Sequence, residues 1–220
     1  MATTKVDVNL IDASGITSSK YLKGDGTWGT VDALPSQTSQ SGKFLTTDGS
    51  DASWGTVADG LSYAQQWQLT ADLSIDNTDN VLYANWALPD ADDSAGSIGS
   101  DMSVDSASSG DLSGAWTFPD TGVWYVAWRC QTHANTANHD FTPKLWTTTD
   151  TGSNWQLAAS AMRLNRANYT QPNLVDYIVN ISNVTTHKVR VSGIVSLNVS
   201  VIKGDDYQGK CVMTFIKLGD

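Results

Sequence analysis

Pairs of carboxylates are the first residues in this sequence whose spacing could support chemistry. Asp90, Asp92 and Asp93 lie close together in a stretch rich in Gly, Ser and Ala, and Asp205 and Asp206 are adjacent. Two carboxyl groups with separated pKa values are what hydrolysis of a glycosidic bond requires. Both groups lie in sequence typical of solvated turns, where Asp is favoured. We therefore expect no catalytic pair and predict that the chain is not an enzyme.

Histidines and further aspartates could instead hold a metal ion. His133 and His139 flank a short Asn/Thr/Ala segment. Imidazole nitrogens bind transition metals, and one such histidine from each of three chains could supply three ligands at a three-fold axis. Aspartate oxygens suit Ca²⁺. The aspartates available for it are Asp79, Asp92, Asp93, Asp101 and Asp105. Because no EF-hand pattern and no Cys/His metal motif accompanies them, we predict no cofactor, with Ca²⁺ as the open alternative.

Aromatic side chains in polar sequence are candidates for sugar binding. Rings stack on sugar faces, while Asn, Asp and Gln hydrogen-bond the hydroxyls. Trp146, Trp155 and Tyr169 lie near polar, turn-rich sequence, although each is also a candidate for the core. The segment 163–171 (RLNRANYTQ) is polar and mixed, so we expect a ligand-binding loop there. Its candidate residues are Arg163, Asn165, Arg166 and Tyr169.

Composition excludes several classes of function. The chain has 13 Lys and Arg against 23 acidic residues, and its formal net charge is −10. Nucleic-acid binding needs a clustered basic surface, whereas the basic residues here are scattered singly. No apolar run approaches the about 20 residues that span a bilayer, and the N-terminal MATTKVDVNL lacks the pattern of a signal peptide. We expect no nucleic-acid partner, no membrane insertion, and synthesis and retention in a cytoplasm.

The two cysteines, Cys130 and Cys211, belong to no metal-binding or redox motif. Buried free cysteines behave as small hydrophobic residues, and we expect both to lie on strands in that role. A disulfide needs Cα atoms within about 7 Å, so the sequence leaves their pairing open.

A repeat near the N-terminus indicates how the chain assembles. The segments KYLKGDGTWGTV (20–31) and KFLTTDGSDASWGTV (43–57) share an aromatic-Leu pair, an Asp-Gly and a Trp-Gly-Thr-Val. Asp-Gly is a strong tight-turn signal, so each copy predicts a β-hairpin. An isolated hairpin is marginal in water, and we therefore predict that identical chains share the burial of its apolar side chains. Those side chains are Tyr21, Leu22, Trp28, Phe44, Leu45 and Trp54. The alternative is two loops lying on the larger domain.

From about residue 62 the sequence changes to short, regular strands. We expect strands at 65–73, 81–87, 115–118, 122–130, 144–148, 155–159, 175–181, 188–192, 194–202 and 210–218. Period-two alternation, with no βαβ rhythm and no Glu among the acidic residues, favours an all-β sandwich or jelly roll. The predicted organisation is a repeated stem over 1–61 and a head domain over 62–220.

Two of the expected strands, VWYVAWRC and CVMTFIKL, are apolar on both faces. A strand buried on both sides is either central in a thick core or covered by a neighbouring subunit. For the last strand we expect a subunit interface in which Met213 and Phe215 take part.

Both parts of the chain resemble known families. The repeated segments KYLKGDGTWGTV and KFLTTDGSDASWGTV resemble the stems of trimeric fibre and surface proteins of tailed bacteriophages. WTFPDTGVWYVAWRC, DYIVNISNVTTHKVRV and GKCVMTFIKLGD resemble the C1q/TNF-type jelly roll, although the collagen-like stem of the animal C1q branch is absent.

The resemblance implies a homotrimeric fibre or spike of a phage virion, assembled in the host cytoplasm. The N-terminal region would contact other virion proteins, and the head would bind a host-surface glycan or receptor. One alternative is a capsid decoration or cement trimer that stabilises the shell. A second alternative is a spike enzyme that degrades glycans.

Overall fold

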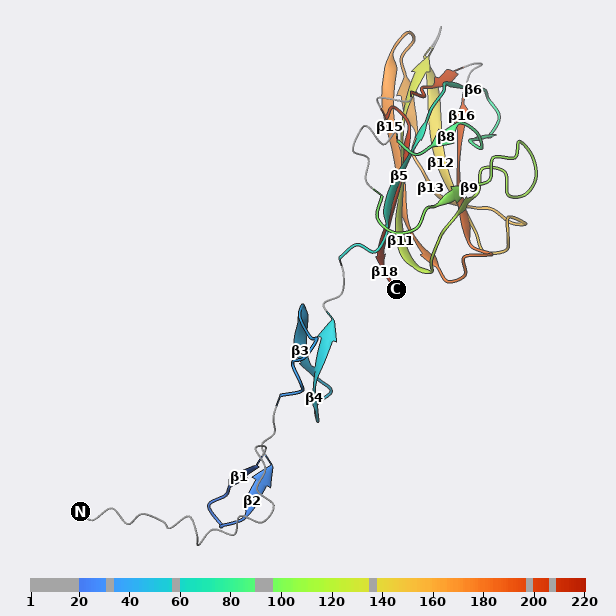
Figure 1. Ribbon diagram of the computed structural model, residues 1–220. Helices are drawn as coiled ribbons and strands as arrows, with labels where there is room; N and C mark the ends of the chain where they lie inside the picture. The colour runs from blue at the N-terminus through green and yellow to red at the C-terminus, as the bar shows by residue number, and fades with distance from the viewer. Residues whose placement is uncertain are drawn as a thin grey trace. The chain divides into compact units, whose positions relative to one another are not determined.

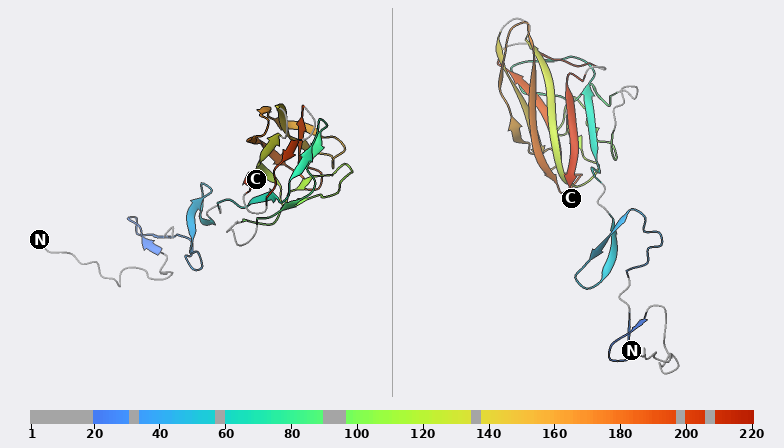
Figure 2. Two further views of the ribbon diagram at one scale, coloured as in Figure 1. Left: turned by 90° about the horizontal axis from the view of Figure 1, so that it is seen from above. Right: turned by 90° about the vertical axis from the view of Figure 1, so that its left-hand side faces the viewer.

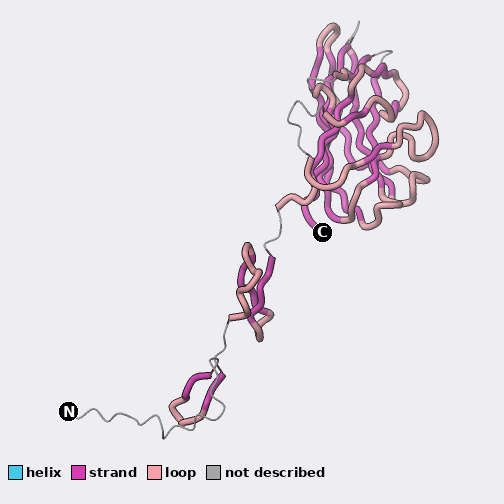
Figure 3. Tube along the Cα trace, in the orientation of Figure 1, coloured by secondary structure: helices cyan, strands magenta, loops and turns pink. Residues whose placement is uncertain are grey.

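The computed structural model describes residues 20–30, 34–56, 60–89, 97–134, 138–196, 200–205 and 209–220. All regular structure in these ranges is β-strand, as Figures 1 and 3 show, so the predicted all-β class is confirmed. Among these residues, no helix is long and apolar enough to cross a membrane. The chain divides into two compact units, Met1–Asp59, here called the hairpin unit, and Gly60–Asp220, here called the sandwich domain.

Each copy of the repeat forms an antiparallel β-hairpin, as predicted (Figure 1). The strands are β1 (Lys20–Leu22) with β2 (Trp28–Thr30), and β3 (Lys43–Thr47) with β4 (Ala52–Thr56). In the turns, Gly26 and Gly49 have φ values of 83° and 99°. Glycine adopts this left-handed region without strain, which explains why both copies keep Asp-Gly.

A ring packed over a glycine explains why both copies also keep Trp-Gly. Tyr21 lies opposite Gly29, and Phe44 lies opposite Gly55. A Cβ atom at Gly29 would lie 2.8 Å from the Tyr21 ring, and one at Gly55 would lie 3.1 Å from the Phe44 ring. Each ring therefore crosses its partner strand over the glycine. The residue Tyr21 is still 50% exposed, and Phe44 is 48% exposed.

The sandwich domain consists of two seven-stranded sheets (Figures 1 and 2). The first, here called the β11 sheet, has the order β6-β17-β11-β18-β5-β8, with β15 also paired to β11. Its strands are β5 (Ala64–Leu69), β6 (Leu73–Ile75), β8 (Trp86–Ala87), β11 (Gly122–Ala134), β15 (Thr170–Ile181), β17 (Ser200–Ile202) and β18 (Val212–Gly219).

The second sheet, here called the β12 sheet, has the order β13-β12-β16-β10-β9, with β14 paired to β12 and β7 paired to β16. Its strands are β7 (Asn80–Val81), β9 (Ser103–Val104), β10 (Trp116–Thr117), β12 (His139–Thr148), β13 (Gln156–Ser160), β14 (Arg163–Asn165) and β16 (Lys188–Val195).

The core lies between the two sheets and is rich in aromatic rings. Alternate residues of β11 enter it, and Trp124 and Trp128 are 1% and 0% exposed. Trp116 from the β12 sheet meets Phe215 from the β11 sheet with ring centroids 4.9 Å apart. Tilted and edge-on ring pairs of this kind add to the stabilisation from burial itself. The large rings therefore join the two sheets to each other.

In the last strand, β18, the side chains that we expected to face a neighbouring subunit face the core instead. Met213 and Phe215 are both 0% exposed and belong to the core of a single chain. Their side chains have no surface to offer a partner, so the expected interface through these two residues is wrong. The period-two alternation of β18 instead turns Ile216 and Leu218 to the other face.

One strand boundary was misplaced because of a glycine. The expected strands 188–192 and 194–202 were divided at Gly193, yet β16 continues through it to Val195. A Cβ atom at Gly193 would lie 2.8 Å from the Phe141 ring of the neighbouring strand. The glycine therefore gives that ring room and does not end the strand.

Candidate binding surfaces of the sandwich domain

The predicted ligand-binding segment 163–171 is only partly a loop. Arg163–Asn165 forms β14, paired to β12, and β15 already begins at Thr170. Asn165 is 0% exposed, and its Nδ2 donates to Thr132 Oγ1 at 2.7 Å. Asn165 is therefore a buried structural residue, which corrects its expected role. Arg166 and Tyr169 lie in the short exposed connection between the strands.

Arg163 lines a surface concavity of about 620 Å³, here called the arginine concavity. Its other lining residues include Arg129, Met162 and Leu174. Arg163 donates to Gln171 Oε1 at 3.1 Å and to the Pro172 carbonyl at 2.8 Å. Among the described ion pairs, neither arginine has a carboxylate partner. Guanidinium groups with apolar neighbours suit a ligand with an acidic group.

The outer face of the β11 sheet carries apolar side chains that the single chain leaves uncovered. Cross-strand pairing places Ile178 of β15, Tyr125 of β11 and Ile216 of β18 in one row. Ile178 is 58% exposed, and Leu218, on β18 like Ile216, is 53% exposed. Burial raises the pKa of Tyr125, and the negative charge of neighbouring Asp176 raises it further. We call this surface the outer β11 face.

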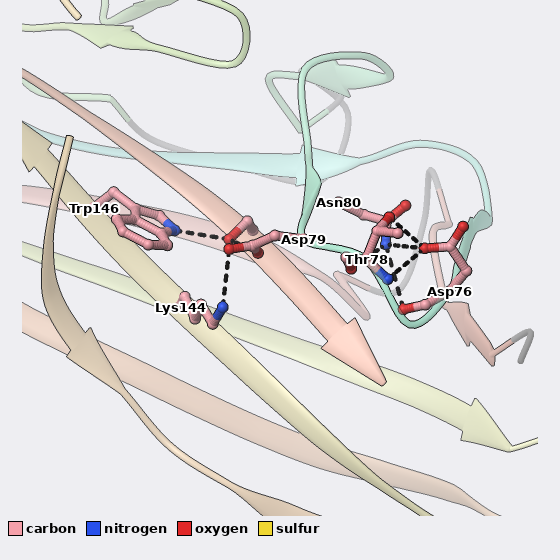
Figure 4. Close-up of polar contacts among 7 residues, drawn as sticks. Asp76, Thr78, Asp79, Asn80, Lys144 and Trp146 are labelled. Carbon is pink, nitrogen blue, oxygen red and sulfur yellow. Dashed lines mark hydrogen bonds and ion pairs between the residues drawn. The ribbon is translucent and has the colours of Figure 1, made fainter. Parts of the chain in front are cut away.

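The β12 sheet carries a polar network centred on Asp79, shown in Figure 4. Lys144 Nζ donates to Asp79 Oδ2 at 2.9 Å, and Ser192 Oγ donates to Asp79 Oδ1 at 2.6 Å. Trp146 Nε1 donates to Ser192 Oγ at 2.8 Å. The indole N–H of Trp146 therefore already has an acceptor within the chain, and the Lys144 ammonium lies beside the ring.

The other tryptophan proposed for sugar stacking is also engaged. Trp155 Nε1 donates to the Asp111 carbonyl at 2.9 Å. The guanidinium carbon of Arg190 lies 4.2 Å from the centroid of the Trp155 ring, a cation–π contact. The face of this ring that meets Arg190 is therefore not available to a sugar. Tyr169, in contrast, is 64% exposed.

The described candidates for a calcium site do not come together. Within the described ranges, no three His, Cys or acidic residues form a group that could hold a metal ion. Asp101 accepts from Gln65 Nε2 at 2.6 Å, and Asp105 accepts from the Ala107 N–H at 2.9 Å. Asp92 and Asp93 lie outside the described residues, as do Asp90 and Asp206 of the carboxylate pairs. Asp205 pairs with Lys210 at 2.6 Å.

The two histidines differ in environment. His139 is 5% exposed, and its Nε2 lies 2.5 Å from the hydroxyl of the fully buried Ser200. His133 is half-buried, and its Nδ1 lies 3.1 Å from Thr170 Oγ1. Because His139 is enclosed, it is not placed to share a metal ion with another chain.

Both cysteines are free and buried, as expected for small hydrophobic residues. Trp128 Nε1 donates to Cys211 Sγ at 3.2 Å. Burial raises the pKa of Cys211 to about 12 and raises that of Cys130 well above its ordinary value. Neither thiol is therefore a nucleophile at neutral pH.

Comparison with solved structures confirms the type of fold. The chain is similar to the Eiger TNF from S. frugiperda, with 10% identity and a TM-score of 0.52 over 72% of this chain and 94% of that one. It also matches the globular domain of zebrafish complement 1qA protein, with 11% identity and a TM-score of 0.41 over 73% of this chain and 98% of that one. No known protein family matches the chain, and no curated protein does. The predicted C1q/TNF-like jelly roll is confirmed as a fold.

Proposed function

We propose that this chain is a non-enzymatic, homotrimeric surface protein of a phage virion that displays its jelly-roll domain to bind a host-surface molecule. The observation that carries the proposal is the outer β11 face. Two large apolar side chains there, Ile178 and Leu218, are more than half exposed. Contiguous exposed apolar surface of this kind is typical of protein interfaces.

A second copy of the same chain is the occupant that fits this face best. The hairpin unit has the same property, because Tyr21, Leu22, Phe44 and Leu45 are 45% to 50% exposed. Hairpins this small cannot bury such side chains alone. Association of identical chains would cover the apolar surface of both units at once. Three copies is the number that the resemblance to phage fibre stems implies.

Display of several heads on one assembly supports binding through avidity. Three weak sites on a common stem raise the effective concentration of each site once the first has bound. The arginine concavity, which includes the sequence-predicted Arg163, is a candidate contact for such a ligand. The hairpin unit would then attach the protein to other virion proteins.

The test is to locate the protein on virus particles and to compete with infection. Antibodies against the purified chain should label the particle surface by electron microscopy, and the purified chain should bind host cells and block adsorption of the virus. Failure to label particles would overturn the virion role. Binding only to emptied capsids, with a rise in their thermal stability, would replace host attachment by capsid decoration. Release of sugar fragments from host polysaccharide would contradict the non-enzymatic assignment.

A further inference from the structure

The arginine concavity brings together side chains from both sheets. Arg129 lies on β11 of one sheet, and Arg163 lies on β14 of the other. Both reach the same part of β15, because Arg129 is the cross-strand neighbour of Leu174 and Arg163 donates to the Pro172 carbonyl. Both arginines are exposed, so a dissolved molecule can reach them. The volume of about 620 Å³ is within the range of about 300–1,000 Å³ that is usual for small-molecule sites.

The two guanidinium groups are held in place and still have hydrogen-bond donors to offer. Arg129 donates through Nη2 to the Gly209 carbonyl at 3.3 Å. Arg163 donates through Nε to Gln171 Oε1 at 3.1 Å and through Nη1 to the Pro172 carbonyl at 2.8 Å. A guanidinium group has five N–H donors. In the described part of the chain, Nε and Nη1 of Arg129 and Nη2 of Arg163 therefore have no acceptor.

The positive charge of these two groups is not neutralised by the described residues. The chain has 23 acidic residues against 13 Lys and Arg, so carboxylates are plentiful. All the described ion pairs are nevertheless made by lysines. The concavity is thus a local positive site on a chain whose net charge is −10. An oxyanion of a ligand would complete it, because guanidinium groups form strong, often bidentate, hydrogen bonds to carboxylate and phosphate.

Apolar side chains form the rest of the lining. Met162 is 74% exposed, and Leu174, Ala161 and Pro172 lie in the same concavity. A methionine side chain is flexible and adapts to the shape of a ligand. The concavity therefore suits a molecule that has an apolar face as well as a negative charge. A sugar ring with an acidic substituent has both, because its C–H groups can pack on carbon while its oxygen atoms accept from the arginines.

The concavity lies at a different level of the β11 sheet from the apolar row proposed as the subunit interface. Arg129 and Leu174 pair across β11 and β15, and Tyr125 and Ile178 pair four residues away along the same strands. Four residues of a strand span about 13 Å. Association through the row that contains Ile178 would therefore leave the arginines open to a ligand.

We propose that the arginine concavity binds an anionic saccharide. Arg129 and Arg163 hold its carboxylate or phosphate group, and one face of a sugar ring packs on Met162 and Leu174. The net charge of −10 opposes non-specific attraction of a polyanion, so binding must come from a local site. This inference rests on the proposed function, because it names the class of host-surface molecule that the displayed domain binds.

The test uses the full-length chain with hexuronate oligosaccharides, hexose phosphate oligosaccharides and the neutral hexose counterparts of both. Calorimetry measures the affinity of the wild type and of Arg129→Gln, Arg163→Gln, Met162→Glu and Lys43→Gln. We expect a uronate or a phosphate member to bind, and its neutral counterpart to bind at least about tenfold more weakly.

The variants separate a local site from the overall charge. Arg129→Gln and Arg163→Gln should each weaken binding at least about tenfold. Met162→Glu places a carboxylate in the concavity from a 74% exposed position, so it should weaken binding as much without a change in thermal stability. Lys43→Gln is the matched control, because it removes one positive charge from an exposed position of the hairpin unit. It should leave the affinity unchanged.

Several results would overturn the inference. Binding of no anionic member, equal affinity for the neutral counterparts, or an equal loss in Lys43→Gln would each exclude this site. Full affinity in Met162→Glu would do so as well, even if Arg163→Gln proved unstable. A trimeric wild type with a monomeric Arg129→Gln variant would show that the concavity is a subunit contact instead.

Failure of the sugar tests and failure of the proposed function can be told apart. If the same preparation is trimeric and binds host cells but binds no anionic saccharide, the proposed function stands and only this inference falls. A monomer that binds no cells would remove the proposed function itself.

Discussion

Replacing Ile178 by Asp should dissociate the proposed trimer while leaving the fold of each chain intact. Ile178 is 58% exposed in the single chain. Full burial of an isoleucine side chain is worth about 1.5–3 kcal/mol, so covering this remaining surface contributes about 1–2 kcal/mol per copy. Loss of that contribution in three copies amounts to about 3–5 kcal/mol, which is about a hundredfold to several thousandfold in the trimer equilibrium. Burying three carboxylates weakens association further.

Sedimentation velocity over a range of concentrations measures this change, and circular dichroism and thermal unfolding report on the fold. Leu157→Asp is the matched control, because Leu157 is 48% exposed on β13 of the other sheet. We expect Ile178→Asp to sediment as a monomer with native circular dichroism, and Leu157→Asp to keep the wild-type mass. An Ile178→Asp protein that remains trimeric at low concentration would refute the assignment of the outer β11 face as the interface.

Three further predictions concern the stability of the sandwich domain. Hydrogen bonds from Thr148 and Asn154 lower the pKa of Asp150 to about 2, below its ordinary value of 3.8. The stability that these hydrogen bonds give is present above pH 4 and is lost as the pH falls through 2. Asp150→Asn should therefore make the free energy of unfolding depend less on pH between 4 and 2. The same pH dependence in the variant and the wild type would contradict this. Gly193→Val should lower the midpoint of chemical denaturation, because the added side chain meets the Phe141 ring; an unchanged midpoint would show that the ring moves at little cost. A thiol reagent should label the two buried cysteines only when the protein unfolds, and mass spectrometry measures the labelling. Rapid labelling of the native protein would contradict this, because it would show that the core opens.

The features that the sequence predicts well are those fixed by local chemistry. The Asp-Gly pairs set the hairpin turns because glycine alone takes their φ values easily, and period-two alternation located most strands. The reason why both copies keep the neighbouring Trp-Gly pair cannot be read from one strand alone. Gly29 and Gly55 are needed because rings from the partner strands cross them.

The features that the sequence misses depend on contacts between distant segments. β18 is apolar on both faces, so its residues alone do not say whether Phe215 or Ile216 enters the core. The core position of Phe215 is settled by Trp116, which lies far away in the chain. Asn165 likewise belongs to a polar segment, and its burial follows from Thr132 on another strand. The polar network centred on Asp79 joins that residue to Ser192, more than a hundred positions later, so no local motif could have indicated it.

The mass of the full-length chain in solution tests the central claim most directly. Light scattering coupled to size-exclusion chromatography gives that mass without assumptions about shape. Association through the outer β11 face predicts about three times the 23.6 kDa of one chain, maintained on dilution to low micromolar concentration. A mass of 23.6 kDa under the same conditions would contradict it, because the apolar outer face would then be exposed in the working protein.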